Sequence, residues 1–261
     1  MDDAELTLFA EELAAAARRE TLPRWSGGCE AEDKGGRAFD PVTDADRGAE
    51  RAMRALIHER YPDHGVTGEE WPDEPGSSRY SWSLDPVDGT RSFICRLPTW
   101  VTLVGLLDEG RPLLGLVDAP CLDETYVGMG KKAWLRSGGR STPVQTSGAV
   151  HLSESRLSTT DPFLFEEAAR DAFSRLSREV RLARYGHDGY AYARLAAGGL
   201  DLVIECGLKP HDYNALIPLV VGAGGTIGDW RGRQDFADGQ IIAAATPQLY
   251  EEAVAWFEPF A

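Results

Sequence analysis

The stretch Leu84-Asp85-Pro86-Val87-Asp88-Gly89-Thr90-Arg91-Ser92-Phe93 decides how the chain around it is interpreted. Residues 81–84 alternate polar and apolar side chains, which predicts a short strand. Asp88 is then expected to be the N-cap of a helical turn that opens at Gly89 and Thr90. Carboxylate and carbonyl oxygens here suit Mg²⁺, and amide groups at a helix start suit a phosphate. An ordinary capped turn explains the same residues, so other parts of the chain must distinguish the two interpretations.

The composition is that of a globular protein with an acidic surface. The chain has 261 residues, of which 43% are hydrophobic and 26% charged, and its formal net charge is −15. Such a charge argues against a nucleic-acid partner and against binding to anionic membranes. A small anionic substrate remains compatible, because metal ions can neutralise a site locally. We expect one domain over residues 1–261, in two halves that meet near 136–160.

The cysteines and the N-terminal residues indicate a cytoplasmic protein. None of the four cysteines forms a Cys-x-x-Cys pair, so neither a zinc motif nor a redox motif is present and free thiols are expected. The first residues, Met-Asp-Asp-Ala-Glu, lack the basic and then apolar pattern of a secretory signal. No apolar run approaches the ~20 residues that span a bilayer.

Hydrophobic periodicity predicts an α/β fold with an antiparallel sheet in the first half and alternating elements in the second. Helices are expected at 4–19, 43–61, 162–176, 190–197, 212–221 and from 247 onward. Strands are expected at 66–70, 81–84, 101–107, 113–117, 124–127, 180–183, 202–205 and 240–244.

Four acidic residues fall at or just past the ends of predicted strands: Glu69, Asp85, Asp88 and Asp212. Strand ends are where open α/β sheets place their ligands. Carboxylates that converge there would repel one another strongly without cations. Metal pairs ~3.5–4 Å apart are the usual clamp for displacement at phosphorus. The four acids therefore predict a site for several Mg²⁺ ions, although a loop position for Glu69 and a helix cap for Asp212 are structural alternatives.

Two charged positions upstream have structural explanations of their own. Thr43 and Asp46 form a capping box in which Asp takes the place of the usual Glu. Capping alone therefore explains Asp46. Lys34 and Arg37 lie in a glycine-rich, charged loop over 26–40, where solvated cations are expected.

The acidic motifs together resemble the inositol monophosphatase superfamily over nearly the whole chain. The motifs that carry this resemblance are Gly68-Glu69-Glu70, Asp85-Pro86-Val87-Asp88-Gly89-Thr90, and His211-Asp212 with Gly222-Ala223-Gly224-Gly225. The resemblance implies a layered α/β/α/β/α sandwich, hydrolysis of a small phosphate monoester with two to three Mg²⁺ ions, and a homodimer.

The resemblance also implies a role for each site residue. Glu69, Asp85 and the carbonyl of Val87 would hold a first Mg²⁺. Asp85, Asp88 and Asp212 would hold a second, and Glu69 would share a third. Thr90, supported by Asp46, would orient the attacking water. Asp88 would also face the substrate, and the amides of Gly89 and Thr90 would cradle its phosphate.

Shorter motifs resemble the histidinol-phosphatase branch, which dephosphorylates L-histidinol phosphate in histidine biosynthesis. They are Leu97-Pro98-Thr99-Trp100, Thr159-Thr160-Asp161-Pro162, Tyr185-Gly186, Tyr190-Ala191-Tyr192 and Gly207-Leu208-Lys209-Pro210. Asp188 and Glu205 match positions that face the leaving group. Two carboxylates suit a cationic amine and an imidazole better than a neutral polyol.

Three departures from that branch keep other substrates open. His211 replaces an expected Tyr, Gly189 replaces an expected Cys, and Cys95-Arg96 replaces a pair of small residues. The alternative substrates are inositol 1-phosphate or another small cyclitol or sugar phosphate. From a different class, a catalytically silent binding protein of the same fold is the remaining alternative.

Overall fold

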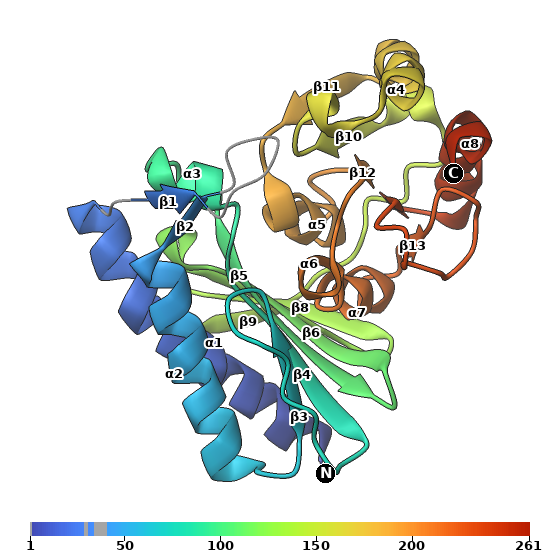
Figure 1. Ribbon diagram of the computed structural model, residues 1–261. Helices are drawn as coiled ribbons and strands as arrows, with labels where there is room; N and C mark the ends of the chain where they lie inside the picture. Colours follow the sequence, from blue (N-terminus) through green and yellow to red (C-terminus); the bar gives the residue numbers. More distant parts are fainter. Residues whose placement is uncertain (1, 29–30, 34–40) are drawn as a thin grey trace.

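The computed structural model describes residues 2–28, 31–33 and 41–261, which form alternating helical and sheet layers (Figure 1). One helix pair covers the outer face of a seven-stranded sheet, a second helical layer lies between the two sheets, and a third covers a five-stranded sheet. This confirms the predicted α/β/α/β/α sandwich. In that order, the layers contain α1 (Asp3–Gly27) and α2 (Asp44–Arg60); α5 (Asp188–Ala196), α6 (Pro210–Tyr213) and α7 (Leu216–Gly222); and α4 (Glu167–Glu179) and α8 (Pro247–Phe257).

The larger sheet has its strands in chain order, with β3 parallel to β4 and every later pair antiparallel. Its strands are β3 (Gly65–Gly68), β4 (Tyr80–Asp88), β5 (Val101–Asp108), β6 (Arg111–Ala119), β7 (Glu124–Met129), β8 (Lys132–Ser137) and β9 (Arg140–Pro143). The smaller sheet is mixed, in the order β11 (Leu182–Tyr185), β10 (Arg156–Thr159), β12 (Leu202–Glu205), β14 (Ile241–Ala244) and β13 (Thr226–Gly228). A short ribbon of β1 (Ala31–Asp33) and β2 (Pro41–Thr43) precedes α2.

Helix α1 shows how the apolar pattern builds the first core. Leu6, Phe9 and Leu13, which recur at helical spacing, are buried against α2 and the sheet together with Trp82 of β4. The helix continues to Gly27, beyond the predicted end at residue 19, and includes Pro23. The predicted capping box of α2 is present, since Thr43 Oγ1 accepts the Ala45 amide and Asp46 accepts the Thr43 amide.

The stretch 136–160, where the two halves were expected to meet, contains the end of the first sheet at Pro143 and the start of the second at Arg156. Two predicted helices differ from the structure. The helix predicted over 162–176 begins only at Glu167, after a short 3₁₀ turn. The helix predicted over 212–221 is two helices. They separate at Asn214, whose side chain donates to Ser83 of β4 over 3.1 Å.

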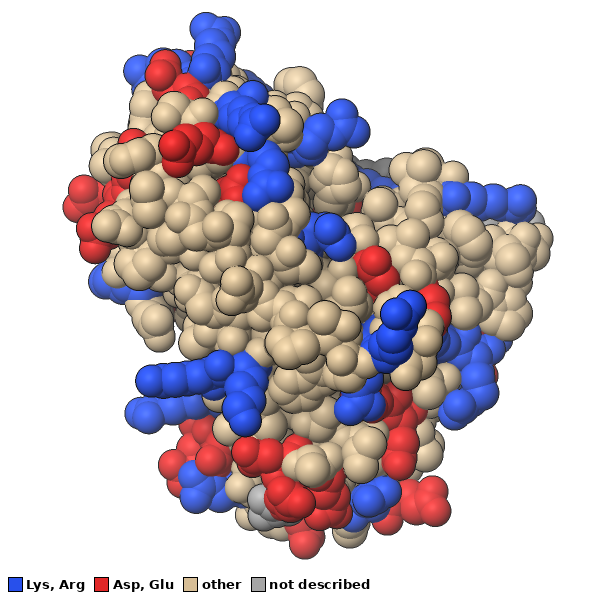
Figure 2. Space-filling model, turned by 180° about the vertical axis from the view of Figure 1, so that it is seen from behind, with Lys and Arg blue, Asp and Glu red and all other residues tan. Residues whose placement is uncertain are grey.

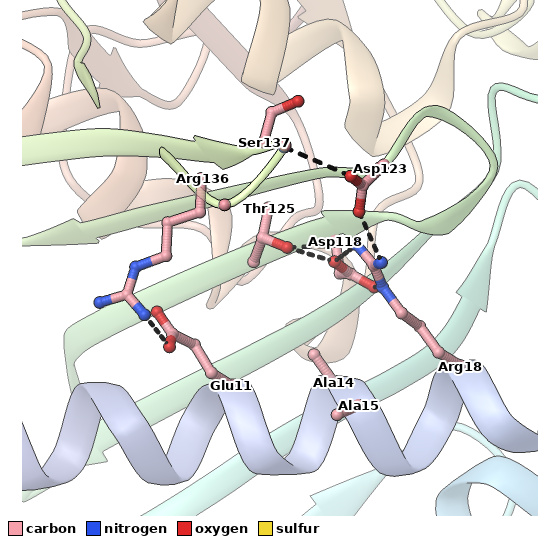
Figure 3. Close-up of a pocket in the computed structure, with 11 residues that line it drawn as sticks. Glu11, Ala14, Ala15, Arg18, Asp118, Asp123, Thr125, Arg136 and Ser137 are labelled. Atoms are coloured by element: carbon pink, nitrogen blue, oxygen red, sulfur yellow. Dashed lines mark hydrogen bonds and ion pairs between the residues drawn. The ribbon is translucent and has the colours of Figure 1, made fainter. Parts of the chain in front are cut away.

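Ion pairs fasten α1 to β6 and β8 of the larger sheet (Figure 3). Arg18 donates to both carboxylate oxygens of the buried Asp118 over 2.6 and 2.7 Å, and to Asp123 over 3.2 Å. Two turns further toward the N-terminus, Glu11 pairs with Arg136 of β8. These side chains line a cavity of about 220 Å³ between α1 and the sheet. We call this set of ion pairs, made by Arg18, Asp118, Asp123, Glu11 and Arg136, the α1 brace. Every acid in the α1 brace faces a guanidinium group.

The surface carries both signs of charge. In the view of Figure 2, acidic side chains gather along the lower edge, basic side chains are scattered among them, and much of the centre is uncharged. Among the described residues, Cys95, Cys121 and Cys206 are free. A search of the helices within the described ranges finds none with the length and apolarity needed to cross a membrane.

Candidate active site

A bulge in β4 brings two acids of the Asp-Pro-x-Asp sequence together. Asp85 pairs with Leu103 of β5 and Asp88 with Val101, so three steps along β4 match two along β5. Residues three apart in a regular strand point to opposite faces, and the extra residue returns both side chains to one side. Pro86 lies in the bulge, where its missing N–H costs the sheet nothing, and its carbonyl accepts the Thr102 hydroxyl over 2.7 Å.

Asp85, Asp88 and Asp212 form a compact carboxylate group. Each offers an oxygen that lies within 4.8 Å of the others. Burial and the charges of Glu69, Asp88 and Asp212 raise the pKa of Asp85 well above its usual range. Burial and the neighbouring acids Asp188 and Asp212 do the same for the pKa of Asp88. Hard cations relieve this repulsion, and the all-oxygen donor set fits such ions.

Asp212 belongs to this group from α6. Glu69 follows the end of β3, and its charge contributes to raising the pKa of Asp85. Gly68 pairs with Leu84 in parallel register, so Glu69 continues β3 beside Asp85. Asp212 accepts the Lys209 amide over 2.6 Å, in the capping box of α6. His211 Nε2 lies 3.5 Å from an Asp212 oxygen, which places His211 at the edge of the cluster.

Asp88 does not cap a helix, which corrects the sequence-based expectation. The N-cap of α3 (Thr90–Ile94) is Gly89, with a φ of 85° and no side-chain cap. Asp88 remains in β4 and accepts the amide of Gly189 at the start of α5. A β-carbon on Gly89 would lie 2.9 Å from a carboxylate oxygen of Asp188, so both the backbone angle and the close approach require glycine.

Thr90 and Asp46, which were expected to act together, make separate hydrogen bonds in the structure. The Thr90 hydroxyl donates to the Val87 carbonyl over 3.1 Å. Asp46 Oδ2 accepts the amide and the hydroxyl of Thr43, whereas its Oδ1 is buried and makes no hydrogen bond within the described part of the chain. Burial raises the pKa of Asp46 to about 6, and the charge of Glu69 adds to this effect. Asp46 is therefore both a cap and an acid with one unused oxygen.

Asp188 and Glu205 meet at Thr160, and the charge of Asp188 acts on Asp88 of the carboxylate group. The Thr160 amide and hydroxyl donate to Glu205 Oε1 over 2.7 and 3.0 Å, and the Thr159 hydroxyl donates to Oε2. Burial raises the pKa of Glu205 to about 8. Burial also raises the pKa of Asp188 to about 6, against the lowering effects of Arg91 and of hydrogen bonds from Ser92 and Thr160.

The sequence interpretation missed the residues that support this site. Thr160 joins the two acids, and Glu50 and Arg54 of α2 bond to the turn that carries Glu69. The sequence does contain a signal for the ion pair of Glu50 and Arg54. The two residues are four apart on α2, beside the apolar positions Ala49 and Met53. Lys34 and Arg37 lie outside the described residues.

Comparison with known proteins identifies the family. The model of the inositol monophosphatase family matches residues 2–259. The chain belongs to the inositol monophosphatase family.

Two relatives and one solved structure show where in the family it lies. A segment of 210 residues is 46% identical to bifunctional phosphatase IMPL2 of Arabidopsis thaliana, and covers 80% of this chain but only 60% of that protein. The histidinol-phosphatase of Chlorobaculum parvum is 33% identical over 216 residues, 82% of either chain. An inositol monophosphatase from Zymomonas mobilis superposes with a TM-score of 0.85 at 35% identity, over 99% of this chain and 100% of that one.

These relationships confirm the predicted superfamily and its histidinol-phosphatase branch, and they confirm the enzyme class. Inositol monophosphatase family members are phosphoric monoester hydrolases that use metal ions. The carboxylates of Asp85, Asp88 and Asp212 are the group in the described chain that fits such ions.

Proposed function

We propose that this protein hydrolyses L-histidinol phosphate with Mg²⁺. The choice of substrate rests on the position and charge of Asp188. Its carboxylate lies against Gly89, directly beside the metal-binding acids, and its pKa of about 6 leaves it mostly ionised at neutral pH. An ammonium or imidazolium group of the substrate would be attracted to this negative charge, whereas a neutral polyol would gain no such attraction.

The oxygen donors would hold two to three Mg²⁺ ions. Glu69, Asp85 and the Val87 carbonyl would hold the first, Asp85, Asp88 and Asp212 the second, and Glu69 would share a weaker third. Bound there, the ions would lower the pKa of the attacking water and stabilise the leaving oxygen. The surrounding chain orients three of these acids, because the amides of Val87, Gly189 and Lys209 donate to the carboxylates of Asp85, Asp88 and Asp212 respectively.

The remaining site residues would orient the water and the phosphate. Thr90 Oγ1 lies next to the Val87 carbonyl, and its hydroxyl oxygen can accept a hydrogen bond from the attacking water. Asp46 would support Thr90 by accepting its hydroxyl hydrogen on the unused Oδ1 once the Val87 carbonyl binds an ion. The amides of Gly89 and Thr90 would donate to phosphate oxygens, and Asp88 would contact the substrate from the metal side.

Glu205 would act on the substrate together with Thr160. Its pKa of about 8 means that it is largely protonated at neutral pH, until a cationic substrate lowers that pKa. A protonated Glu205 would also accept or donate a hydrogen bond with a neutral hydroxyl. This observation favours the second candidate, inositol 1-phosphate or another small cyclitol or sugar phosphate.

Phosphate release tests the proposal. We expect purified protein with excess Mg²⁺ to prefer L-histidinol phosphate to inositol 1-phosphate. Asp188→Asn should lower kcat/KM for the cationic substrate by about 10- to 100-fold and change that for the polyol by much less. Asp171→Asn is the control, since it removes one exposed charge from α4. Preference for the polyol would favour the second candidate, and inactivity on both and on an aryl phosphate would revive the silent binding protein.

Three expectations complete the proposal. We propose a single phosphatase domain, a homodimer, and a cytoplasmic protein whose partner is a small metabolite rather than nucleic acid. The net charge of −15 supports the last point. Light scattering of the purified protein tests the dimer directly.

A further inference from the structure

Helix α2 carries a buried ion pair. Glu50 is fully buried and the Arg54 side chain is 6% exposed, and their nearest atoms lie 2.8 Å apart. Burying two charges is costly unless further hydrogen bonds satisfy the remaining donors and acceptors. The partners that satisfy this pair therefore indicate what it holds in place.

Those partners belong to one turn, residues 69–74, which follows β3. Glu50 Oε2 accepts the Glu70 amide over 2.8 Å, and Oε1 accepts the Trp71 amide over 3.3 Å. Arg54 donates to the Trp71 carbonyl over 3.1 Å and to the Glu74 carboxylate over 2.9 Å. The pair thus binds the turn through both donors and acceptors of its backbone.

The start of the turn is built around the same carboxylate. A β-carbon on Gly68 would lie 2.2 Å from Glu50 Oε1, so only glycine admits Glu50 at this distance. Glu69 stands between Gly68, which Glu50 contacts, and Glu70, whose amide Glu50 binds. Its backbone is consequently held on both sides by one buried side chain.

We infer that Glu50 and Arg54 are positioning residues that hold Glu69 in place to bind metal. The inference rests on the proposed function, because it requires Glu69 to be a metal ligand. Glu69 is the proposed ligand that comes from a turn rather than from β4 or α6, so its place depends on what binds that turn. Its charge already raises the pKa values of Asp85 and Asp46, which shows that it faces the acidic site.

A matched pair of variants separates positioning from general stability. Glu50→Gln and Asp118→Asn each remove the negative charge of a buried ion pair, the first beside Glu69 and the second in the α1 brace. Binding of Mn²⁺ alone, followed by electron paramagnetic resonance, reports metal affinity without turnover. Because supporting residues of a metal ligand typically contribute 10- to 100-fold, we expect Glu50→Gln to weaken Mn²⁺ binding by about tenfold.

Activity gives the second readout. The Mg²⁺ concentration for half-maximal activity should rise by the same factor in Glu50→Gln, while kcat at saturating Mg²⁺ stays within about threefold. Arg54→Lys keeps the cation but loses the forked contacts to the turn, and it should show a smaller shift in the same direction. This second variant keeps the test informative if Glu50→Gln does not fold.

The outcomes are distinct. Equal Mn²⁺ affinity in Glu50→Gln and Asp118→Asn, with similar losses of melting temperature, would overturn the inference. Glu69→Gln must itself weaken Mn²⁺ binding. If it does, and the Glu50 and Arg54 variants do not, the positioning role alone is wrong. If Glu69→Gln binds Mn²⁺ as the unaltered protein does, the metal role of Glu69 is wrong and the inference falls with it.

Discussion

Asp118 and Asp85 are both buried acids on neighbouring parts of one sheet, yet their surroundings are opposite. Asp118 faces Arg18, which donates to both of its oxygens (Figure 3). Asp85 faces Glu69, Asp88 and Asp212, all of the same sign. The first group is neutralised by the chain itself. The second group leaves its charge to be neutralised from outside, which is the property expected of a metal site and not of a structural brace.

The largest expected effect comes from removing a carboxylate of the acidic group around Asp85. Asp85→Asn should reduce phosphate release by about 10³-fold or more, because it removes a ligand proposed to be shared by two ions. In the presence of a chelator the same variant should be more stable than the unaltered protein, because one of several repelling charges is gone. Thermal unfolding with EDTA measures this. A fully active Asp85→Asn variant would contradict the metal assignment.

Glu205 sharpens the comparison, because its partners are neither arginines nor other carboxylates but two threonines. In the folded protein the pKa of Glu205 is about 8, against 4.5 in an ordinary glutamate. At pH values between these two, the chain therefore takes up a proton when it folds. The unfolding free energy should therefore fall as pH rises from about 4.5 to 8. Glu205→Gln should lack this loss, which we expect to be on the order of 5 kcal/mol. Parallel denaturation curves across this pH range would show no difference if Glu205 titrates normally.

Breaking the brace should affect stability and not chemistry. Asp118→Asn leaves Arg18 without its main partner, and because Arg18 is partly exposed we expect a loss of about 2 kcal/mol. That corresponds to a fall in melting temperature of roughly 4–8 °C for a chain of this size. Phosphate release below the transition should be unchanged. A large loss of kcat in this variant would show that the brace acts on the site.

The smallest expected effect is the pH dependence of metal stabilisation. The pKa values of Asp85 and Asp88 are raised, so without metal the folded state retains their protons and loses stability as pH rises. Mg²⁺ binds the ionised acids and should raise the melting temperature more at pH 7.5 than at pH 5.5, by a few degrees (about 1 kcal/mol). Equal shifts at both pH values would indicate that Mg²⁺ binds elsewhere.

Several helices, several strands and the acidic site could be predicted from the sequence alone, because they depend on local chemistry. Periodicity placed α1, α2 and the strands around 101–117, because one apolar face of each must be buried. The types and spacing of Asp85, Asp88 and Asp212 indicated a hard-metal site, because carboxylates collected at strand ends need cations whatever the fold details are. The capping box at Thr43 and Asp46 was likewise readable, because its bonds join residues three apart.

Other features depended on contacts between distant parts of the chain. The register of β4 against β5 turned Asp88 from a helix cap into a partner of Asp85. The bond from the Asn214 side chain to Ser83 fastens the junction of α6 and α7 to β4. The exposed strand β9 has no apolar pattern and exists because β8 pairs with it. Glu50 and Arg54 can bind the turn after β3 only because α2 packs beside that turn. Sequence patterns report burial and local bonds, whereas register and side-chain partners are decided when the layers pack together.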